Sequence, residues 1–440
     1  MNELGIVQEY TVKARELPAP DVLVAGGGIA GCMAAIAAAR AGAQVLLVEA
    51  CGSVGGVTTF TAGQHICFCG DSAGQGQIFD ELVAELEQLD AIVPYQPWRA
   101  EDILTFSHEE WDYGIARYFD ATVFGLVLGE MVNREPKLDI LFHTRVIDVA
   151  AQDGRIEDAL LHNASGLHLV RPAVVIDCTG DANLCDMAGF PCIAGRESDG
   201  MPIPGALFVT LRDIGEPVAP RLPSWGVEYE NAEDMPMVAL TLSRERRADF
   251  RVKVAGHDTT TAAGLTRAEL ESRRTVLSAV HHLQKHDYPT WKLDSVSPQV
   301  GTRIGRRIAG EYMLTADDAR RGATFEDGIG RGTCNLSDKS LMDGSTDRQT
   351  HAELDVEIVP PYQIPYRSLV PKESKNVLVA GRCMSADSWA LSSARMMPAC
   401  AMMGQAAGIA AAWSAAAGGN VMQIDMGRLQ KTLRARGARF

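Results

Sequence analysis

The feature that most constrains the fold is a glycine motif, G-x-G-x-x-G at 26–31, that stands between two short apolar runs. The run at 21–25 is typical of a buried parallel strand, and the motif opens an alanine-rich helix. A second apolar run at 44–48 completes a βαβ unit. In this context the motif predicts a Rossmann-type fold that binds a dinucleotide, and a merely structural glycine turn is the less favoured alternative.

The residues of this unit each have a physical task in such a site. Gly26 permits the tight turn, Gly28 lets the backbone approach a pyrophosphate, and Gly31 lets the helix close on the strand. The helix N-terminus supplies N–H groups and the positive end of its dipole. Glu49 ends the second strand, where its carboxylate can accept a hydrogen bond from a ribose hydroxyl. The glycine pair at 55–56 leaves room for backbone beside a ligand.

Length and charge limit the classes of protein and of partner. A chain of 440 residues predicts two or three domains, since one domain spans about 150 residues. The net charge of −15, from 41 basic and 56 acidic residues, disfavours nucleic acid as a partner. Uninterrupted apolar runs stay shorter than the roughly 18 residues that a membrane span needs, so we expect no membrane association.

The N-terminal segment and the cysteines bear on the compartment. The segment carries acidic residues where a signal peptide has positive charge, and no apolar stretch follows it. The ten cysteines include no C-x-x-C pair, and we expect them to be reduced thiols. These observations predict a cytoplasmic protein. The histidine and cysteine spacing predicts no metal site.

The Rossmann pattern is interrupted between about 196 and 298. A strand at 206–211 and a helix from Thr266, which begins a capping-box sequence, mark a separate unit. The pattern resumes with an apolar strand at 376–380 and a helix that Pro398 opens. The predicted fold class is α/β, with a discontinuous Rossmann-type nucleotide domain and an inserted α+β substrate or cap domain. The expected boundaries are 1–195 and 299–440 for the two parts of the nucleotide domain and 196–298 for the insertion.

Five sequence blocks, at 21–56, 174–189, 301–318, 362–387 and 392–412, resemble the FAD-dependent oxidoreductases of the glutathione-reductase structural superfamily. The resemblance spans most of the chain, and five blocks in the family's order are more specific than the first motif alone. It implies an FAD-binding nucleotide domain, although the βαβ unit by itself does not separate FAD from NAD.

The resemblance also implies which residues hold the cofactor. The first glycine motif would hold the pyrophosphate, Glu49 the adenosine ribose, and Val146 would lie near the adenine. The helix that follows Met397 would point its N-terminus at the pyrimidine edge of the flavin, where it would stabilise negative charge. The full set of implied cofactor contacts is Gly26, Gly28, Gly31, Glu49, Gly55, Gly56, Val146, Thr179, Gly180, Gly381, Arg382 and Met397.

The chain departs from the family's pattern at three places. The family often has a His in the segment that here reads Ala386–Trp389 without one. The family's Arg-Glu-Ser-Arg-Arg block is Arg-Ile-Gly-Arg-Arg at 303–307, so that a polar pair is missing. The family's Asp-x-His segment, expected near Asp338, is also absent. The departures do not affect the residues implied to bind FAD. They mean that the family's catalytic acid or base cannot be assigned to a residue of this chain by resemblance.

Several polar residues are candidates for the chemistry. Arg303 is suited to bind a substrate carboxylate, with a structural ion pair as an equal alternative. Asp387 is a candidate base, and His65 is a candidate base or covalent flavin link, although a packed histidine is the favoured interpretation. Tyr366 and Arg395 are comparable candidates. For the pair at 306–307 we favour ion pairs at a domain interface.

The sequence therefore predicts an FAD-dependent dehydrogenase or oxidase that removes hydride from a small organic metabolite at flavin N5, with a carboxylate-bearing substrate as one option. Oxygen or a carrier would accept the electrons, and a homo-oligomer stays open. A flavin monooxygenase is less favoured, because the aromatic hydroxylases have a Gly-Asp pair where Gly381-Arg382 stands. A non-enzymatic binding protein would not need an intact glycine motif with Glu49, and the net charge of −15 disfavours a tRNA-modifying flavoprotein.

Overall fold

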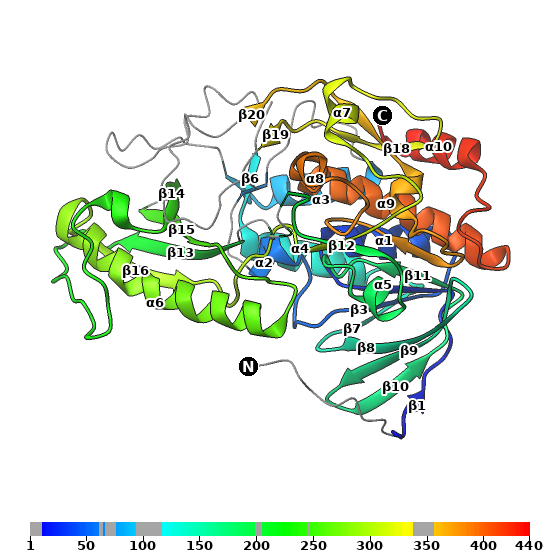
Figure 1. Cartoon of the computed structure of the whole chain (residues 1–440), viewed down its shortest axis with the longest axis horizontal. Coiled ribbons are helices and arrows are strands. Elements are labelled where there is room, and N and C mark those ends of the chain that lie inside the picture. Colours follow the sequence, from blue (N-terminus) through cyan, green and yellow to red (C-terminus); the bar gives the residue numbers. More distant parts are fainter. Residues whose placement is uncertain are drawn as a thin grey trace.

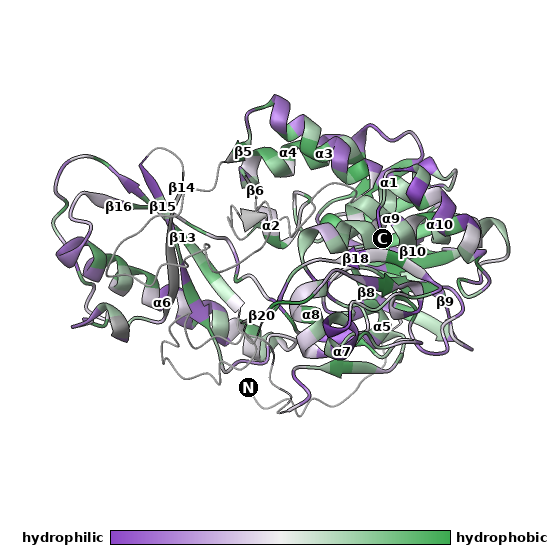
Figure 2. Ribbon diagram, turned by 90° about the horizontal axis from the view of Figure 1, so that it is seen from above, coloured by the Kyte–Doolittle hydropathy of each residue, from purple (hydrophilic) through white to green (hydrophobic). Residues whose placement is uncertain are grey.

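The structure is a computed structural model, which describes residues 11–60, 65–66, 76–93, 117–198, 200, 202, 205–243, 246–337 and 356–440. Its elements form two lobes (Figure 1). The larger lobe contains a central parallel sheet, and the smaller lobe contains an antiparallel sheet covered by one long helix. Figure 2, seen from above, shows the same separation.

The central sheet has five parallel strands in the order β22 (Val377–Val379), β11 (Val174–Asp177), β2 (Val22–Ala25), β3 (Val45–Val48) and β7 (Leu138–Leu141). All residues of the first four strands are buried. Short continuous apolar runs favour this arrangement, because a parallel sheet is covered on both faces. The predicted α/β fold with a Rossmann-type sheet is confirmed.

Two helices that are far apart in sequence pack directly on one another beside this sheet. They are α1 (Ile29–Arg40), which follows the glycine motif, and α9 (Met397–Ala416). A Cβ added at Gly404 would lie 2.2 Å from the carbonyl oxygen of Ala30, and one at Gly408 would lie 2.1 Å from that of Ala34. Because both contacts advance in the same direction by four residues, α1 and α9 run parallel to one another.

Further elements complete the larger lobe. A four-stranded sheet has the order β1 (Arg15–Glu16), β10 (Gly166–Val170), β9 (Arg155–Asn163) and β8 (Arg145–Gln152). The remaining helices of this lobe are α2 (Val57–Phe60), α3 (Gln77–Gln88), α4 (Ala121–Asn133), α5 (Asn183–Met187), α7 (Ala316–Arg320), α8 (Ser388–Ala394) and α10 (Met426–Ala435), with a 3₁₀ turn at Tyr366–Leu369. A second 3₁₀ turn, Ala232–Asp234, belongs to the smaller lobe. The remaining small sheets pair β12 (Cys192–Ala194) with β17 (Arg306–Ile308), β18 (Gly328–Gly332) with β21 (Tyr362–Pro365), β19 (Leu336–Ser337) with β20 (Val356–Glu357), and β4 (His65–Ile66) and β5 (Ile92–Val93) with β6 (Arg117–Phe119).

The smaller lobe is an antiparallel sheet in the order β14 (Met237–Ser243), β15 (Arg247–Val254), β13 (Gly205–Asp213) and β16 (Trp291–Val296). The helix α6 (Ala262–His286) packs on it. Its apolar residues form a cluster separate from the main core. These elements lie inside the predicted insertion, whose exact bounds stay a prediction.

The prediction that the long helix begins at Thr266 is wrong. The helix begins at Ala262, and the hydroxyl of Thr261 caps it by accepting a hydrogen bond from the amide of Gly264 at 3.1 Å. Thr266 lies inside the helix and donates its hydroxyl to the carbonyl of Ala262 at 2.7 Å. Glu269, the acidic member of the expected capping box, instead accepts a hydrogen bond from the amide of Val300.

The expectation that all cysteines are reduced is also wrong at one position. Seven cysteines of the described residues are free thiols, whereas Cys334 is disulfide-bonded. The absence of a C-x-x-C pair excludes only a bond between near neighbours in sequence, so it could not exclude this one.

None of the helices in the described ranges is both long and apolar enough to span a membrane.

Candidate cofactor and active site

The first glycine loop is tight on one side and open on the other. Gly26 has φ of +100°, and a Cβ there would lie 2.5 Å from the carbonyl oxygen of Cys178. A Cβ at Gly31 would lie 1.8 Å from the carbonyl oxygen of Gly26. A Cβ at Gly28 would meet nothing within 4 Å. The loop therefore packs against the protein at Gly26 and Gly31 and leaves open space at Gly28, where the sequence predicts the pyrophosphate.

The second glycine pair lies directly against the first loop. The amide of Gly55 donates to the carbonyl of Gly27 at 2.8 Å, and Gly55 pairs with Gly28 as an isolated parallel bridge. Gly55 and Gly56 have φ of +104° and +58°, a region that favours glycine. A Cβ at Gly56 would lie 3.1 Å from the Cα of Gly28. Two segments that are separate in sequence thus form one glycine-lined surface.

Glu49 is fixed beside this surface. Its side chain is buried, with 7% exposed. Oε2 accepts a hydrogen bond from the amide of Gly27 at 2.6 Å, and Oε1 accepts one from the amide of Cys51 at 2.8 Å. Each carboxylate oxygen has a second lone pair, so both can still accept from a ribose hydroxyl. Val146, predicted to lie near the adenine, is half-buried in β8 and packs against the main core.

The parallel packing of α1 and α9 brings two helix N-termini to the same edge of the sheet. Because Gly404 lies on Ala30 in the first turn of α1, the first residues of α9, Met397–Met403, extend beyond the start of α1. At 1.5 Å per residue this extension is about 10 Å. Gly381, with φ of +96°, lies beside α1, since a Cβ there would be 3.2 Å from the Cβ of Ala30. The positive ends of both helix dipoles therefore lie at the edge that carries the glycine loops.

These residues fit an FAD molecule. The open space at Gly28 together with the N-terminus of α1 suits a pyrophosphate, and Glu49 suits the adenosine ribose. The start of α9, marked by Met397, lies farther along the same edge and suits the electron-rich end of the flavin. FAD bound there would supply the redox chemistry.

The return crossing of the sheet at 177–181 is held by a residue that the sequence did not single out. The Asp177 carboxylate is fully buried and accepts hydrogen bonds from the Thr179 amide and hydroxyl, at 3.0 and 2.7 Å. It also accepts from the amides of Leu184 and Cys185 in α5. Asp177 is the last residue of an apolar strand, and all of these partners lie within eight residues after it. An acidic residue just before a short helix is a common capping pattern, and this pattern could have indicated the role of Asp177 from the sequence.

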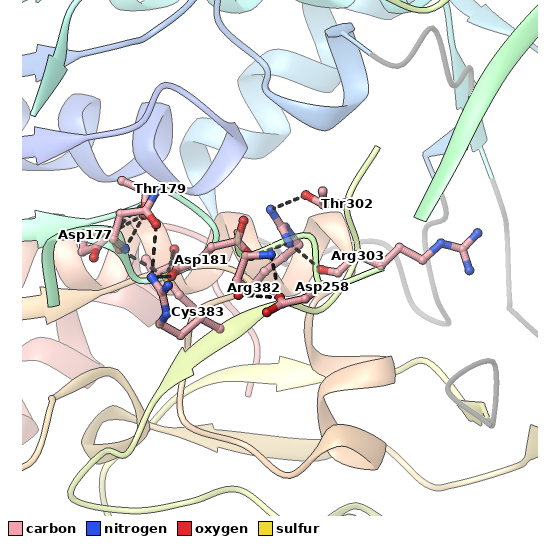
Figure 3. A network of polar contacts seen from close by, with 12 residues as sticks. Asp177, Thr179, Asp181, Asp258, Thr302, Arg303, Arg382 and Cys383 are labelled. Carbon is pink, nitrogen blue, oxygen red and sulfur yellow. Dashed lines mark hydrogen bonds and ion pairs between the residues drawn. The ribbon is translucent and has the colours of Figure 1, made fainter. Parts of the chain in front are cut away.

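Arg382, predicted as a cofactor contact, binds groups of the protein (Figure 3). Its Nη1 donates to the carbonyl oxygen of Arg303 at 2.5 Å and lies 3.4 Å from Asp181 Oδ1. Its Nη2 donates to the Thr302 hydroxyl at 3.3 Å. Gly180 makes room for this guanidinium, since a Cβ there would lie 2.5 Å from Nη2. Arg382 thus joins the return crossing to the segment that leads back from the smaller lobe.

Arg306 and Arg307 of the 303–307 block bind other groups of the protein. Arg307 is fully buried and donates to the carbonyl oxygens of Ala386 and Gly195, both at 2.6 Å, and forms an ion pair with Glu197. Burial lowers the pKa of Arg307. Arg306 lies 3.1 Å from Asp186. These contacts agree with the ion pairs expected for this pair of arginines, whereas their location at a domain interface stays a prediction. In Figure 3 the Arg303 side chain extends away from Arg382 and Asp181.

Asp387 caps a helix. Its Oδ1 accepts from the Ala390 amide and its Oδ2 from the Ala316 amide, both at 2.7 Å. Burial raises the pKa of Asp387, although these amides oppose the shift. The bond to Ala390 caps α8, and the bond to Ala316 joins Asp387 to α7. The role of Asp387 as a base stays a prediction.

The remaining three candidates lie in different places. Arg395 ends α8 directly before α9, and its carbonyl accepts from the Cys400 thiol, so it lies at the proposed flavin edge. Tyr366 is buried and donates its hydroxyl to the carbonyl of Val421 at 2.9 Å, beyond the opposite end of α9. His65 pairs with Tyr118 in the backbone of β4 and β6, but its side chain lies outside the described residues. The structure therefore groups Arg303 with Arg382 and places Arg395 at the start of α9, and it does not bring Tyr366 to that end.

In the described ranges, no three His, Cys, Asp or Glu side chains are placed to hold a metal ion.

The sheet, the paired glycine loops and the buried Glu49 carboxylate are typical of a dinucleotide-binding α/β protein. The family model described as FAD dependent oxidoreductase matches residues 21–433, and the chain belongs to this family. It is an FAD-dependent oxidoreductase with FAD as its cofactor. The predicted family, cofactor and enzyme class are confirmed, and the non-enzymatic alternative is set aside.

Comparison with known proteins gives one curated relative and a common fold. The chain is 26% identical over 223 residues to the tRNA uridine 5-carboxymethylaminomethyl modification enzyme MnmG of Chlorobaculum tepidum, over 49% of this chain and 34% of that protein. It therefore spans about a third of that relative's length. A geranylgeranyl bacteriochlorophyll reductase-like protein of Thermoplasma acidophilum has a similar structure, with a TM-score of 0.52 and 12% identity over 97% of this chain and 85% of the other. A p-nitrophenol 4-monooxygenase, PnpA, of Pseudomonas putida DLL-E4 has a TM-score of 0.43 and 13% identity over 68% and 70% of the two chains.

Proposed function

We propose that this FAD-dependent oxidoreductase is a dehydrogenase or oxidase that acts on a small organic metabolite. The observation that carries the proposal is the parallel packing of α1 and α9 through Gly404 and Gly408. It supports a pyrophosphate at the first helix N-terminus and a flavin ring about 10 Å farther along, at the second.

When bound, FAD supplies a hydride acceptor at its N5 atom. The chain's own contribution is electrostatic. The N-terminus of α9, with Pro398 in its first turn, provides unpaired N–H groups and a positive dipole end that favour negative charge nearby. This environment would stabilise negative charge on a flavin bound at the start of α9.

Arg303 is our candidate for holding a carboxylate-bearing substrate. A guanidinium binds both oxygens of a carboxylate through two parallel hydrogen bonds, which fixes orientation as well as charge. Its backbone is held by Arg382 within the larger lobe, at the point where the chain returns from the smaller lobe. This place favours a substrate pocket between the flavin and the smaller lobe, with oxygen or a carrier as the electron acceptor.

The tRNA substrate of the curated relative does not transfer readily to this chain. The match covers 34% of that relative, and the net charge of this chain is −15. Such a charge opposes the approach of a polyanion unless a basic surface compensates. A small metabolite needs no such surface.

The test is a visible absorption spectrum of the purified protein, repeated on pellet and supernatant after acid precipitation. We expect a flavin spectrum that is released into the supernatant, which indicates non-covalent FAD and justifies an anaerobic screen of small carboxylates and their neutral analogues. Colour in the pellet would indicate a covalent link, with His65 as the first residue to replace. Absence of flavin after reconstitution with FAD would overturn the proposal.

A matched pair of glycine variants tests the placement of the cofactor. Gly28→Leu points into open space beside the proposed pyrophosphate, and Gly427→Leu lies in α10, where a Cβ makes only an ordinary contact with Asp425. Gly28→Leu should fold but lose its flavin, whereas Gly427→Leu should keep it. A fully loaded Gly28→Leu protein would show that the pyrophosphate lies elsewhere.

A further inference from the structure

We propose that Arg382 is a positioning residue for Arg303 and not a ligand of the cofactor. This inference rests on the proposed function, because it assigns a task to the substrate-binding arginine. The juxtaposition that carries it is the set of contacts between one guanidinium, the Arg303 carbonyl, the Thr302 hydroxyl and the Asp181 carboxylate (Figure 3).

The contacts of Arg382 join three segments that are far apart in sequence. Asp181 follows β11, the pair 302–303 precedes β17, and Arg382 follows β22. Nη1 donates to the Arg303 carbonyl at 2.5 Å and faces Asp181 Oδ1 at 3.4 Å, while Nη2 donates to Thr302 Oγ1 at 3.3 Å. The Arg382 and Asp181 side chains are only 17% and 20% exposed, so the ion pair is weakly screened by solvent.

Glycine at two positions makes room for this arrangement. A Cβ at Gly180 would lie 2.5 Å from Arg382 Nη2, and a Cβ at Gly305 would lie 2.4 Å from Asp181 Oδ1. The neighbouring Ile304 is buried and the carboxylate of Asp181 fills the space beside Gly305. Arg382 and Asp181 thus occupy the space that side chains at 180 and 305 would otherwise fill.

The consequence for Arg303 is geometric. Arg382 binds the main chain of Arg303, while the Arg303 side chain extends in another direction (Figure 3). A long arginine side chain places its guanidinium accurately on a ligand only if its own backbone is fixed, because any displacement of the backbone also displaces the guanidinium. Lysine can replace Arg382 only in part, because a single ammonium cannot span the carboxylate, the hydroxyl and the carbonyl as a planar fork does.

The first experiment measures how firmly Arg382 holds the 302–303 segment, and it needs no substrate. Backbone amide hydrogen exchange over 301–305 is compared in the flavin-loaded wild type, Arg382→Gln, Arg382→Lys and Arg306→Gln. Arg306 is the matched control, because it also contacts the return crossing but binds Asp186 and the Asp181 carbonyl, not the 302–303 segment. We expect exchange to rise about tenfold in Arg382→Gln, less in Arg382→Lys, and not in the control. Unchanged exchange in Arg382→Gln would overturn the proposal.

The second experiment separates a positioning residue from a cofactor ligand. FAD binding to the apoprotein of Arg382→Gln should stay within about threefold of the wild type, since the guanidinium is used by protein groups. Loss of flavin as severe as in Gly28→Leu would show that Arg382 binds the cofactor and would overturn the inference.

The third experiment uses benzoate as a carboxylate probe, with benzamide as its neutral control, and follows the flavin absorption band. Arg303→Ala and Arg382→Gln should each weaken benzoate binding about tenfold, and the double variant should bind no worse than Arg303→Ala alone. Additive losses would show that Arg382 does not act through Arg303 and would overturn the inference. If Arg303→Ala leaves benzoate binding unchanged, the carboxylate role in the proposed function fails, and hydrogen exchange alone decides whether Arg382 holds the segment.

Discussion

The parallel sheet and the antiparallel sheet of the smaller lobe are both rich in apolar strands, but they are packed in different ways. Strands β2 and β3 are buried at every residue, and α1 approaches α9 so closely that glycine faces a carbonyl oxygen. In the smaller lobe burial varies along the strands, as in β16, and side chains of α6 fill the interface. The larger lobe is held together by backbone contacts so close that no side chain fits between them. The smaller lobe is held together by ordinary side-chain packing.

This difference predicts where a small change is tolerated. An added methyl group in the glycine contacts must displace backbone, which a sheet covered on both faces cannot readily allow. A methyl group removed from the smaller lobe leaves a cavity that neighbouring side chains can partly fill. We therefore expect substitutions at the close glycine contacts of the larger lobe, such as Gly31, to abolish the fold and the cofactor site together, and substitutions in the smaller lobe to act locally.

The largest effect is expected for Gly31→Val. The new Cβ would lie 1.8 Å from the carbonyl oxygen of Gly26, a contact that forces the glycine loop apart. We expect a loss of more than about 4 kcal/mol in the free energy of unfolding, enough to prevent isolation of a folded, flavin-loaded protein. Circular dichroism on heating and gel filtration measure this. A folded yellow Gly31→Val protein would contradict the claim that backbone contact governs this region.

Phe250→Ala should have the next largest effect, confined to the smaller lobe. Phe250 is fully buried in the cluster of that lobe, so its removal should cost about 3–5 kcal/mol in local stability. We expect an earlier melting step in circular dichroism, with flavin absorbance retained through that step. Loss of flavin in the same step would show that the two lobes unfold as one unit and would remove the basis of the comparison.

The same difference explains how much of the fold was predictable. Continuous apolar runs predicted β2, β3 and β22 close to their observed bounds, because strands buried on both faces leave a clear signal. In the smaller lobe β13 was predicted, whereas β14, β15 and β16 were not, since partial burial leaves a weaker pattern.

The candidate site was predictable only where chemistry follows local sequence. The glycine motif and Glu49 carry their meaning within one βαβ unit, and the structure places them together. The contacts of Arg382 could not be predicted, because Asp181 and Thr302 lie 201 and 80 residues away in sequence. The contact of Asp387 with the Ala316 amide was likewise hidden, since Ala316 lies 71 residues away in sequence, whereas its cap of α8 through the Ala390 amide is local.

Asp318→Asn tests polar stabilisation outside both sheets. The buried carboxylate accepts hydrogen bonds from the Tyr312 hydroxyl and from the amide and hydroxyl of Thr315, each at 2.9 Å. Burial alone would raise the pKa of Asp318, but these hydrogen bonds and the charge of Arg321 lower it overall. Removing the charge should cost about 1–3 kcal/mol at pH 7.

The pH dependence of that difference has a definite sign. A carboxylate with a lowered pKa in the folded state stabilises the fold above its unfolded pKa of about 3.9, and this stabilisation is lost as the pH falls through the folded value. The gap between wild type and Asp318→Asn, measured by urea unfolding, should therefore be constant from pH 7 to about 5 and shrink below about 4. A gap that persists unchanged at low pH would mean that the ionised form contributes nothing.

The smallest effect is expected at the start of α6, and it returns to the smaller lobe. Thr261→Ala removes the hydroxyl that accepts from the Gly264 amide, so it should cost about 1 kcal/mol. Thr266→Ala is the matched control, because its hydroxyl lies inside the helix on the carbonyl of Ala262, where alanine is the better helix former. We expect the control to be neutral or slightly stabilising in urea unfolding. The opposite order would mean that the helix starts at Thr266 after all, as its capping-box sequence alone would indicate, and that the sequence pattern was the better guide to this lobe.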